Sequence, residues 1–141
     1  MFKKILMPTD ASENSQRAFA IAVGIARQFN SEIELFHVTF TPEAIGYVLS
    51  QGVPVPQEQF DISGEQVLLR TLNSTNCEHV FVQKKQVPGH PAATILEEIK
   101  RERIDLVVMG SRGYGPLSGS LMGSVSQRVL HGATCPVLIV K

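Results

Sequence analysis

The stretch Asp105-Leu106-Val107-Val108-Met109-Gly110-Ser111-Arg112-Gly113 is an apolar, β-branched run that ends abruptly in a loop rich in glycine, serine and arginine. The loop continues to Gly123-Ser124-Val125-Ser126, where a helix is expected with Val125, Val129 and Leu130 on one apolar face. This order predicts a strand, a loop and a helix. In open α/β sheets, ligands bind beyond the carboxyl ends of the strands, and a helix start offers unpaired N–H groups to an anion. The stretch therefore predicts a ligand that carries phosphate.

The rest of the chain alternates between apolar runs of strand length and segments with helical periodicity. Ser12 is a plausible N-cap for the first helix, Asn30 ends that helix, and Pro91 suits the first position of a later one. The stretch from Thr41 to Asp61 contains three prolines without clear periodicity and predicts a long surface excursion with one short helix. Besides the run at 105–110, strands are expected at 3–8, 32–38, 80–82 and 137–140, and helices at 13–29, 62–77 and 91–103.

Five alternations of strand and helix predict parallel pairing, right-handed crossovers and helices on both faces of one sheet. The fold class is α/β: a doubly wound, five-stranded parallel sheet of the Rossmann-like or flavodoxin-like type, with strand order 3-2-1-4-5. In that order the first and fourth strands are neighbours at the point where the winding reverses. Residues 8–10, Val38 and Gly110 are then expected around one crevice.

Length and composition predict one domain over residues 1–141. Thirteen basic and thirteen acidic residues cancel, so no net field draws the chain to nucleic acid or to a membrane surface. No apolar run approaches the roughly 20 residues of a membrane span, and the start of the chain does not resemble a signal peptide. The expected location is the cytosol. Cys77 and Cys135 stand far apart without metal-ligand spacing, so two reduced thiols are expected.

The loop after the fourth strand has the residues that a polyphosphate requires. Glycine lets the backbone approach an anion closely, hydroxyl groups donate hydrogen bonds, and Arg112 adds a permanent positive charge. By contrast, Asp10 and Glu13 place carboxylates at the loop after the first strand, where the phosphate of a flavodoxin-type FMN would be repelled. The fourth loop is therefore expected to hold a triphosphate. Its glycines are Gly110, Gly113, Gly115, Gly119 and Gly123, and its serines are Ser111, Ser118, Ser120, Ser124 and Ser126.

Common phosphate motifs do not match. Gly123 is followed by Ser124 and not by lysine, so the loop is not a P-loop, and the first turn lacks the dinucleotide-binding glycines. A response-regulator site is excluded because Asp10 stands alone and the third strand leads to Lys84-Lys85 without a phosphoacceptor aspartate.

The spacing of the glycines resembles a known signature. Gly110, two residues, Gly113, nine residues and then Gly123-Ser124 is similar to the ATP-binding signature of the universal stress protein family. The resemblance extends over essentially the whole chain. It includes the opening Ile5-Leu6-Met7-Pro8-Thr9-Asp10, His37-Val38, Gly89-His90-Pro91-Ala92 and the closing Cys135-Pro136-Val137-Leu138.

The resemblance implies a nucleotide site with two ends. The adenine and ribose end would be lined by Pro8, Thr9, Asp10 and Val38, and the ribose and phosphates would be surrounded by Met109, Gly110, Arg112, Gly113, Gly123, Ser124, Val125 and Ser126. It also implies Mg²⁺ or Mn²⁺ carried by the phosphates, with no direct protein ligand. A homodimer through Val137–Val140 is implied as well, and an apolar sheet edge at these residues fits that expectation.

Catalytic residues are not evident. Among the four histidines only His90 is expected in a loop at the crevice, and no second partner accompanies it. ATP hydrolysis needs a positioned nucleophile, and Asp10 is better suited to position a ribose hydroxyl or the backbone. The first hypothesis is therefore a nucleotide-dependent regulatory or stress-response protein that acts on an unidentified protein partner. The alternatives are a slow ATPase or nucleotidyl- or phosphotransferase that uses the same pocket, and a purely structural loop without nucleotide.

Overall fold

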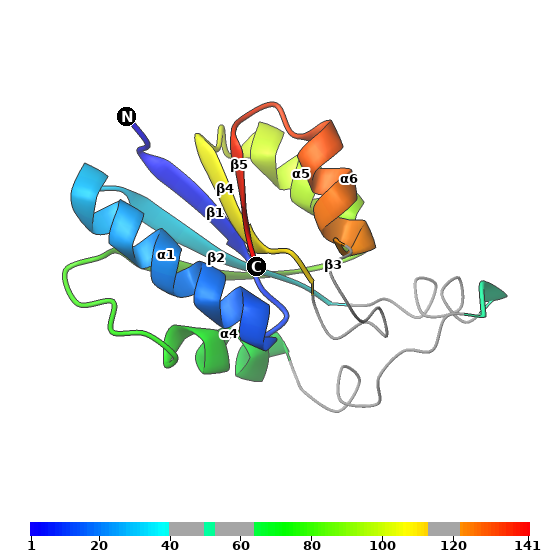
Figure 1. Cartoon of the computed structure of the whole chain (residues 1–141), viewed down its shortest axis with the longest axis horizontal. Coiled ribbons are helices and arrows are strands. Elements are labelled where there is room, and N and C mark those ends of the chain that lie inside the picture. Colours follow the sequence, from blue (N-terminus) through cyan, green and yellow to red (C-terminus); the bar gives the residue numbers. More distant parts are fainter. Residues whose placement is uncertain (40–49, 53–63, 113–121) are drawn as a thin grey trace.

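A computed structural model describes residues 1–39, 50–52, 64–112 and 122–141. Strands and helices alternate along the chain (Figure 1). The elements are β1 (Lys4–Pro8), α1 (Glu13–Phe29), β2 (Glu32–Thr39), α4 (Gly64–Leu72), β3 (Val82–Pro88), α5 (Pro91–Arg101), β4 (Leu106–Gly110), α6 (Ser124–Gly132) and β5 (Val137–Val140). The expected excursion from Thr41 to Asp61 lies almost entirely outside the described residues.

The five strands form one parallel sheet in the order β3-β2-β1-β4-β5, which confirms the predicted fold class and strand order. Central β1 pairs with β2 on one side, with Ile5 opposite Ile33, and with β4 on the other, with Ile5 opposite Leu106. The chain therefore reverses its winding between β1 and β4. All five strands run in one direction, so the ends of β1, β2 and β4 share one edge of the sheet (Figure 1).

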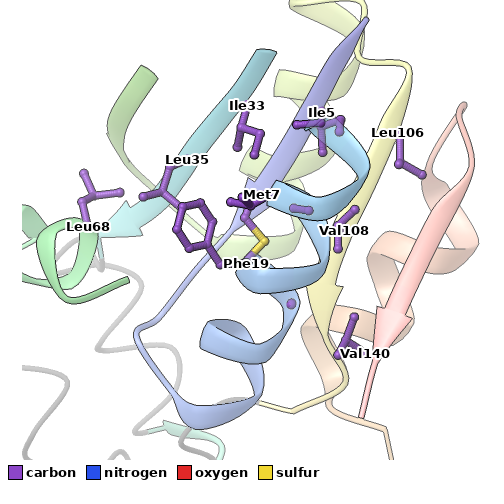
Figure 2. Packing of buried hydrophobic residues seen from close by; sticks show 13 residues of the cluster. Ile5, Met7, Phe19, Ile33, Leu35, Leu68, Leu106, Val108 and Val140 are labelled. Carbon is purple, nitrogen blue, oxygen red and sulfur yellow. The ribbon is translucent and has the colours of Figure 1, made fainter. Parts of the chain in front are cut away.

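Two apolar cores cover the two faces of the sheet. Helices α1 and α4 lie on one face, and α5 and α6 lie on the other (Figure 1). On the α1 face, Phe19 packs against Met7, Leu35 and Val108 (Figure 2). On the α5 face, Phe36, Ile95, Val107 and Val129 belong to the second core. Burial on both faces explains why the inner strands β1 and β4 are almost continuously apolar.

The predicted helix boundaries are confirmed where a capping residue marks them. Ser12 caps α1, and its hydroxyl accepts a hydrogen bond from the N–H of Ser15. Asn30 ends α1 in the left-handed conformation, with φ of 53°. Pro91 occupies the first turn of α5, where its missing N–H costs nothing.

The predicted position of the third strand is wrong. The sequence predicts this strand on the apolar run Val80-Phe81-Val82, but β3 spans Val82–Pro88 and includes the polar run Gln83-Lys84-Lys85-Gln86. Val80 instead closes a turn through its N–H to the carbonyl of Cys77, and Phe81 is 65% exposed. Because β3 is an edge strand paired only with β2, the side chains of Gln83, Lys84 and Gln86 remain exposed, and Lys85 is partly exposed. A prediction based on hydrophobicity therefore places the third strand at the wrong residues.

The apolar face predicted for the last helix is corrected at one residue, Leu130. Val129 is fully buried, but its neighbour Leu130 on the same helix is 42% exposed. Phe29 is 41% exposed and packs edge-on against Phe2, with ring centroids 5.5 Å apart, at the end of α1. Both residues lie near helix ends, where the apolar stripe leaves the core. Within the described ranges, no helix is long and apolar enough to cross a bilayer.

Candidate functional site

The candidate residues lie at the carboxyl edge of the sheet and at the start of α6. Pro8 ends β1 and is followed by Thr9 and Asp10, while Val38 is the penultimate residue of β2. Met109 and Gly110 end β4, and Arg112 follows two residues later. Gly123 caps α6, whose first three residues are Ser124, Val125 and Ser126. Gly113 lies outside the described residues. The ends of β1 and β4 are therefore neighbours, as the predicted crevice requires.

Gly110 allows α1 to start directly against the end of β4. A Cβ atom on Gly110 would lie 2.9 Å from the carbonyl carbon of Asn14, closer than such atoms approach. The contact is reinforced from the side chain, because Asn14 Nδ2 donates a 3.1 Å hydrogen bond to Ser111 Oγ. The first turn of α1 and the end of β4 are thus held together at the candidate site.

Two hydrogen bonds fix the start of α6 beside the end of β4, and a third ties the end of β4 to β5. The N–H of Gly123 donates to the carbonyl of Ser111 at 2.7 Å, and Ser126 Oγ donates to the carbonyl of Gly110 at 2.8 Å. The N–H of Ser111 donates to the carbonyl of Val140 on β5 at 2.7 Å. Residues 111 and 123, which are far apart in sequence, are therefore in direct contact, and α6 starts at a defined place.

The start of α6 can receive an anion. Its cap residue is Gly123, which has no side chain that could accept an N–H group of the first turn. Ser124 is exposed and Val125 is partly exposed, whereas Ser126 is buried and its hydroxyl is used by Gly110. Arg112, also partly exposed, is the cation that follows β4 on the chain. Backbone donors and a positive charge are the groups that bind phosphate oxygens.

The loop after β1 is rigid. Asp10 Oδ1 accepts the N–H of Ser12 at 2.9 Å, which forms the turn that leads into α1. Thr9 is buried, and its hydroxyl contacts that of Thr71 on α4 at 2.6 Å and accepts the N–H of Ala11 at 3.0 Å. Asp10 remains partly exposed. Its carboxylate is thus held in place by the backbone at the end of β1.

His37 supports this loop from β2. Its Nδ1 lies 2.8 Å from the carbonyl oxygen of Thr9, which can only accept, so Nδ1 carries the proton and donates. Burial lowers the pKa of His37, against the opposing effects of this hydrogen bond and of the nearby Asp10 carboxylate. The imidazole therefore acts as a neutral brace for the β1 loop. His90, by contrast, is exposed at the cap of α5, after β3, and two strands separate it from the junction of β1 and β4.

The candidate residues divide into two groups by burial. Pro8, Thr9, Met109, Gly110 and Ser126 are buried and shape the site from behind. The second group is at least partly exposed and consists of Asp10, Arg112, Gly123, Ser124 and Val125. Val38 is 7% exposed and packs in the core on the α5 face of the sheet.

The sequence did not predict the supporting contacts of three residues. Asn14 and Ser111 join α1 to β4, and His37 braces the β1 loop. The sequence contains one feature that could have predicted the contact between Asn14 and Gly110, because a glycine at the end of a buried strand often marks a close backbone approach. No sequence feature predicts the role of His37, since that role depends on where the Thr9 carbonyl points after folding.

One other groove is less suitable as a ligand site. An open groove between α1 and α4 is lined by Gln16, Gln66, Leu69, Arg70, Asn73 and Ser74, none of which is a candidate residue. Among the described residues, no group of three or more histidine, cysteine, aspartate or glutamate side chains is arranged to hold a metal ion.

Comparison with known proteins agrees with this fold. The model of the universal stress protein family matches residues 1–141. A universal stress protein of Methanocaldococcus jannaschii is 32% identical over 141 residues, which cover 100% of this chain and 83% of the relative. The structure of a universal stress protein from Lactobacillus plantarum has a TM-score of 0.76 and 25% identity, covering 99% of this chain and 98% of that one.

A universal stress protein family structure from Arabidopsis thaliana, solved with AMP bound, has a TM-score of 0.66 and 26% identity, with 99% of this chain and 91% of that one covered. Other solved universal stress proteins of the same fold are complexes with cAMP or dAMP; at 23% and 16% identity they show the fold alone. The family match over the full length, together with the strand order and the glycine spacing, places this chain in the universal stress protein family.

Proposed function

We propose that this chain is an ATP-binding universal stress protein that acts as a nucleotide-dependent regulatory module. The observation that carries the proposal is the start of α6, which has a glycine cap without a side-chain acceptor and is fixed beside β4 by the Gly123–Ser111 and Ser126–Gly110 hydrogen bonds. Uncapped N–H groups at a fixed position bind an anion without a cost of ordering the backbone.

The two ends of the nucleotide follow from the charges at the site. Phosphates belong at Arg112 and the start of α6, together with Gly113, because these groups are cationic or donate N–H. Adenine and ribose belong at Pro8, Thr9, Asp10 and Val38, where a carboxylate can accept a ribose hydroxyl and would repel phosphate. Met109 and Gly110 lie between these ends. The AMP found in the plant relative supports an adenine nucleotide as the ligand class.

A divalent cation, Mg²⁺ or Mn²⁺, would be carried mainly by the phosphates. Among the described residues no acidic cluster could supply a ligand set, so phosphate oxygens and water would have to do so. The ion would neutralise part of the phosphate charge. Arg112 and the α6 N–H groups would balance the remainder.

Regulation is favoured over turnover by the role of Asp10. Its Oδ1 accepts the N–H of Ser12, so this carboxylate holds the β1 loop rather than a water molecule in line with a phosphate. Slow ATP hydrolysis or phosphoryl transfer remains the alternative and is measured in the same experiment. We place the protein in the cytoplasm, where ATP is available.

A homodimer through β5 is part of the proposal. β5 is an edge strand with Leu138 38% exposed, and Ile21 on α1 is 42% exposed. Arg17 on α1 donates to the carbonyl of Lys141, which sets this part of α1 beside the end of β5. A second copy that covers this edge would bury both apolar side chains. Leu138→Asp is expected to give a monomer by light scattering, whereas an unchanged dimer would exclude this edge.

The test is titration calorimetry with ATP and Mg²⁺ on the wild-type chain and on Gly123→Val. A Cβ at Gly123 would lie 3.3 Å from the carbonyl oxygen of Ser111, so a valine there fills the space at the helix start. We expect at least a tenfold loss of affinity with an unchanged circular dichroism spectrum. The matched control is Gly24→Val, because nothing lies within 4 Å of a Cβ at exposed Gly24.

Undiminished affinity in Gly123→Val would remove the phosphate assignment. Mass spectrometry of the small molecule that co-purifies with the wild-type chain identifies the nucleotide independently. Retained intact ATP supports the regulatory role, and multiple turnovers that are lost in Arg112→Ala would establish the enzymatic alternative instead.

A further inference from the structure

A cluster of charged side chains is enclosed between the sheet and α5, on the face opposite α1. Glu34 from β2 and Glu98 from α5 have side chains that are only 3% exposed. Lys4 from β1 and Lys85 from β3 are 20% and 27% exposed, and Glu102 from α5 is 30% exposed. Charged groups at this depth are costly unless each has a partner.

The lysines make their shortest contacts with residues other than Glu34. Lys4 Nζ donates to Glu102 Oε2 at 2.6 Å and lies 3.7 Å from Glu34 Oε2. Lys85 Nζ donates to Glu98 Oε1 and lies 3.5 Å from Glu102 Oε1. Glu98 is therefore paired with a lysine at hydrogen-bonding distance, whereas the ion pair of Glu34 is with Lys4 at 3.7 Å.

Glu34 also carries a buried oxygen that lacks a hydrogen bond. Oε1 of Glu34 is the buried side-chain polar atom without a partner among the described residues. A carboxylate oxygen cannot donate, so an ionised Glu34 gains nothing from a second carboxylate. Glu98 lies within hydrogen-bonding reach of Glu34, so a protonated Glu34 can donate its O–H to Glu98, which changes a repulsion between two carboxylates into a hydrogen bond.

We propose that Glu34 is a proton-binding site, in which its carboxyl group holds one proton and donates it in a hydrogen bond to Glu98, and that release of this proton loosens α5 and edge strand β3 against the sheet. With the proton bound, the negative charges of Glu98 and Glu102 are matched by Lys4 and Lys85. Release adds a third negative charge inside the cluster. The remaining charged groups are Arg101, 57% exposed and bonded to Glu98, and Glu32, 49% exposed and 4.0 Å from Lys4.

The position of the cluster explains why these two elements would respond. Lys85 joins β3 to α5, and β3 pairs with β2 alone. Glu98 and Glu102 lie in the second half of α5 and just beyond it, so repulsion from Glu34 acts on that end of the helix. The nucleotide site lies at the opposite ends of β1 and β4, so this proposal does not depend on the proposed function.

The proton is expected to leave near neutral pH. The pKa of Glu34 is raised to about 7, and burial is the largest cause. The hydrogen bond and the charge of Glu98 also raise this pKa, whereas the charges of Lys85 and Lys4 lower it. Because the pKa is higher in the folded chain than in the unfolded one, the stabilisation is complete below the ordinary value of 4.5 and is lost as pH rises to about 7. One such proton changes the unfolding equilibrium by up to about tenfold per pH unit within that window.

The experiment uses the full chain and compares wild type with Glu34→Gln. Glutamine has the same shape and can donate an N–H to Glu98, so the variant mimics the protonated state at every pH. The matched control is Glu32→Gln, which removes an exposed carboxylate from the same strand. Carbon-13 NMR of the wild-type carboxyl groups should show one midpoint near 7 that is absent in Glu34→Gln and present in Glu32→Gln.

Two readouts follow the coupling to structure. Denaturation between about pH 5 and about pH 8 should give a stability difference, wild type minus Glu34→Gln, that falls as pH rises. Hydrogen exchange, corrected for its intrinsic pH dependence, should show protection lost at high pH in α5 and β3 of wild type but not in α1. Glu34→Gln should retain this protection.

A wild-type Glu34 that titrates below about pH 5.5 would overturn the proton-binding site. If Glu34→Gln fails to fold, the wild-type titration still decides this point. A normal titration near 7 without loss of protection in α5 and β3 would overturn the structural coupling. Loss of ATP binding in Glu34→Gln or Glu32→Gln changes neither the conclusion on the proton-binding site nor the conclusion on the structural coupling.

Discussion

The hydroxyl of Ser126, in the first turn of α6, donates a 2.8 Å hydrogen bond to the carbonyl of Gly110, the last residue of β4. This bond and the contact between Gly123 and Ser111 position the start of α6 independently of any ligand. The helix is therefore pre-organised for an anion, which lowers the entropic cost of binding.

Ser126→Ala is expected to destabilise the protein by about 1–3 kcal/mol, because it removes the donor to a buried carbonyl. Nucleotide affinity should fall as well, since the start of α6 loses one of its anchors. Urea denaturation and calorimetry measure the two effects. Ser124→Ala is the control for stability, because Ser124 is exposed and a surface change there should remain within about 0.5 kcal/mol. Equal stability of both variants would contradict this role for Ser126.

Gly110→Ala is expected to cost about 1–3 kcal/mol, because its Cβ would lie 2.9 Å from the backbone of Asn14 and would push α1 away from β4. Gly24→Ala is the counterpart within α1. Nothing lies within 4 Å of a Cβ there, so the higher helix propensity of alanine should stabilise the chain by up to about 1 kcal/mol. Thermal or urea denaturation checks both signs, and a neutral Gly110→Ala would show that the contact relaxes freely.

The hydroxyl pair Thr9 and Thr71 should respond unequally to valine. Thr71 Oγ1 donates its single proton to the carbonyl of Val67, so it must accept from Thr9. After Thr71→Val, the Thr9 hydroxyl can donate to Ser15 Oγ, 3.1 Å away, and the loss should be about 0.5–1.5 kcal/mol. Thr9→Val also removes the acceptor for the N–H of Ala11, so we expect about 1–3 kcal/mol. A larger loss for Thr71→Val in urea denaturation would reject this proton assignment.

His37 should destabilise the folded chain in acid. Burial lowers the pKa of His37 below its ordinary value of 6.5, so the unfolded chain binds a proton more readily. The stabilisation by neutral His37 is complete above pH 6.5 and is lost as the pH falls from 6.5 through the lower pKa of the folded chain. The stability difference, wild type minus His37→Asn, should therefore decrease on acidification, and the ring should titrate below 6.5 by NMR. A ring midpoint above that value would contradict the assignment. The sign is opposite to that expected for Glu34, so the two variants separate the contributions.

Sequence reasoning succeeded best where one element carried its own signal. The apolar run of β4, the caps Ser12 and Asn30 and the proline of α5 all act locally, and the structure confirms them. It failed at β3, where Gln83-Lys84-Lys85-Gln86 forms a strand because β2 offers an unpaired edge. Local polarity indicates a loop there, whereas the backbone pairing that overrides it is non-local.

Patterns among neighbouring residues specify the class of fold, the alternation of strands and helices and the glycine loop after β4, because periodicity and backbone freedom are local properties. The meeting of groups across long separations depends on how the whole chain packs. The contact of Gly110 with Asn14, the bond from His37 to the Thr9 carbonyl and the enclosure of Glu34 beside Glu98 arise from strand order and helix placement. Burial and the positions of charges depend on all the packed elements together, so no window of sequence contains them.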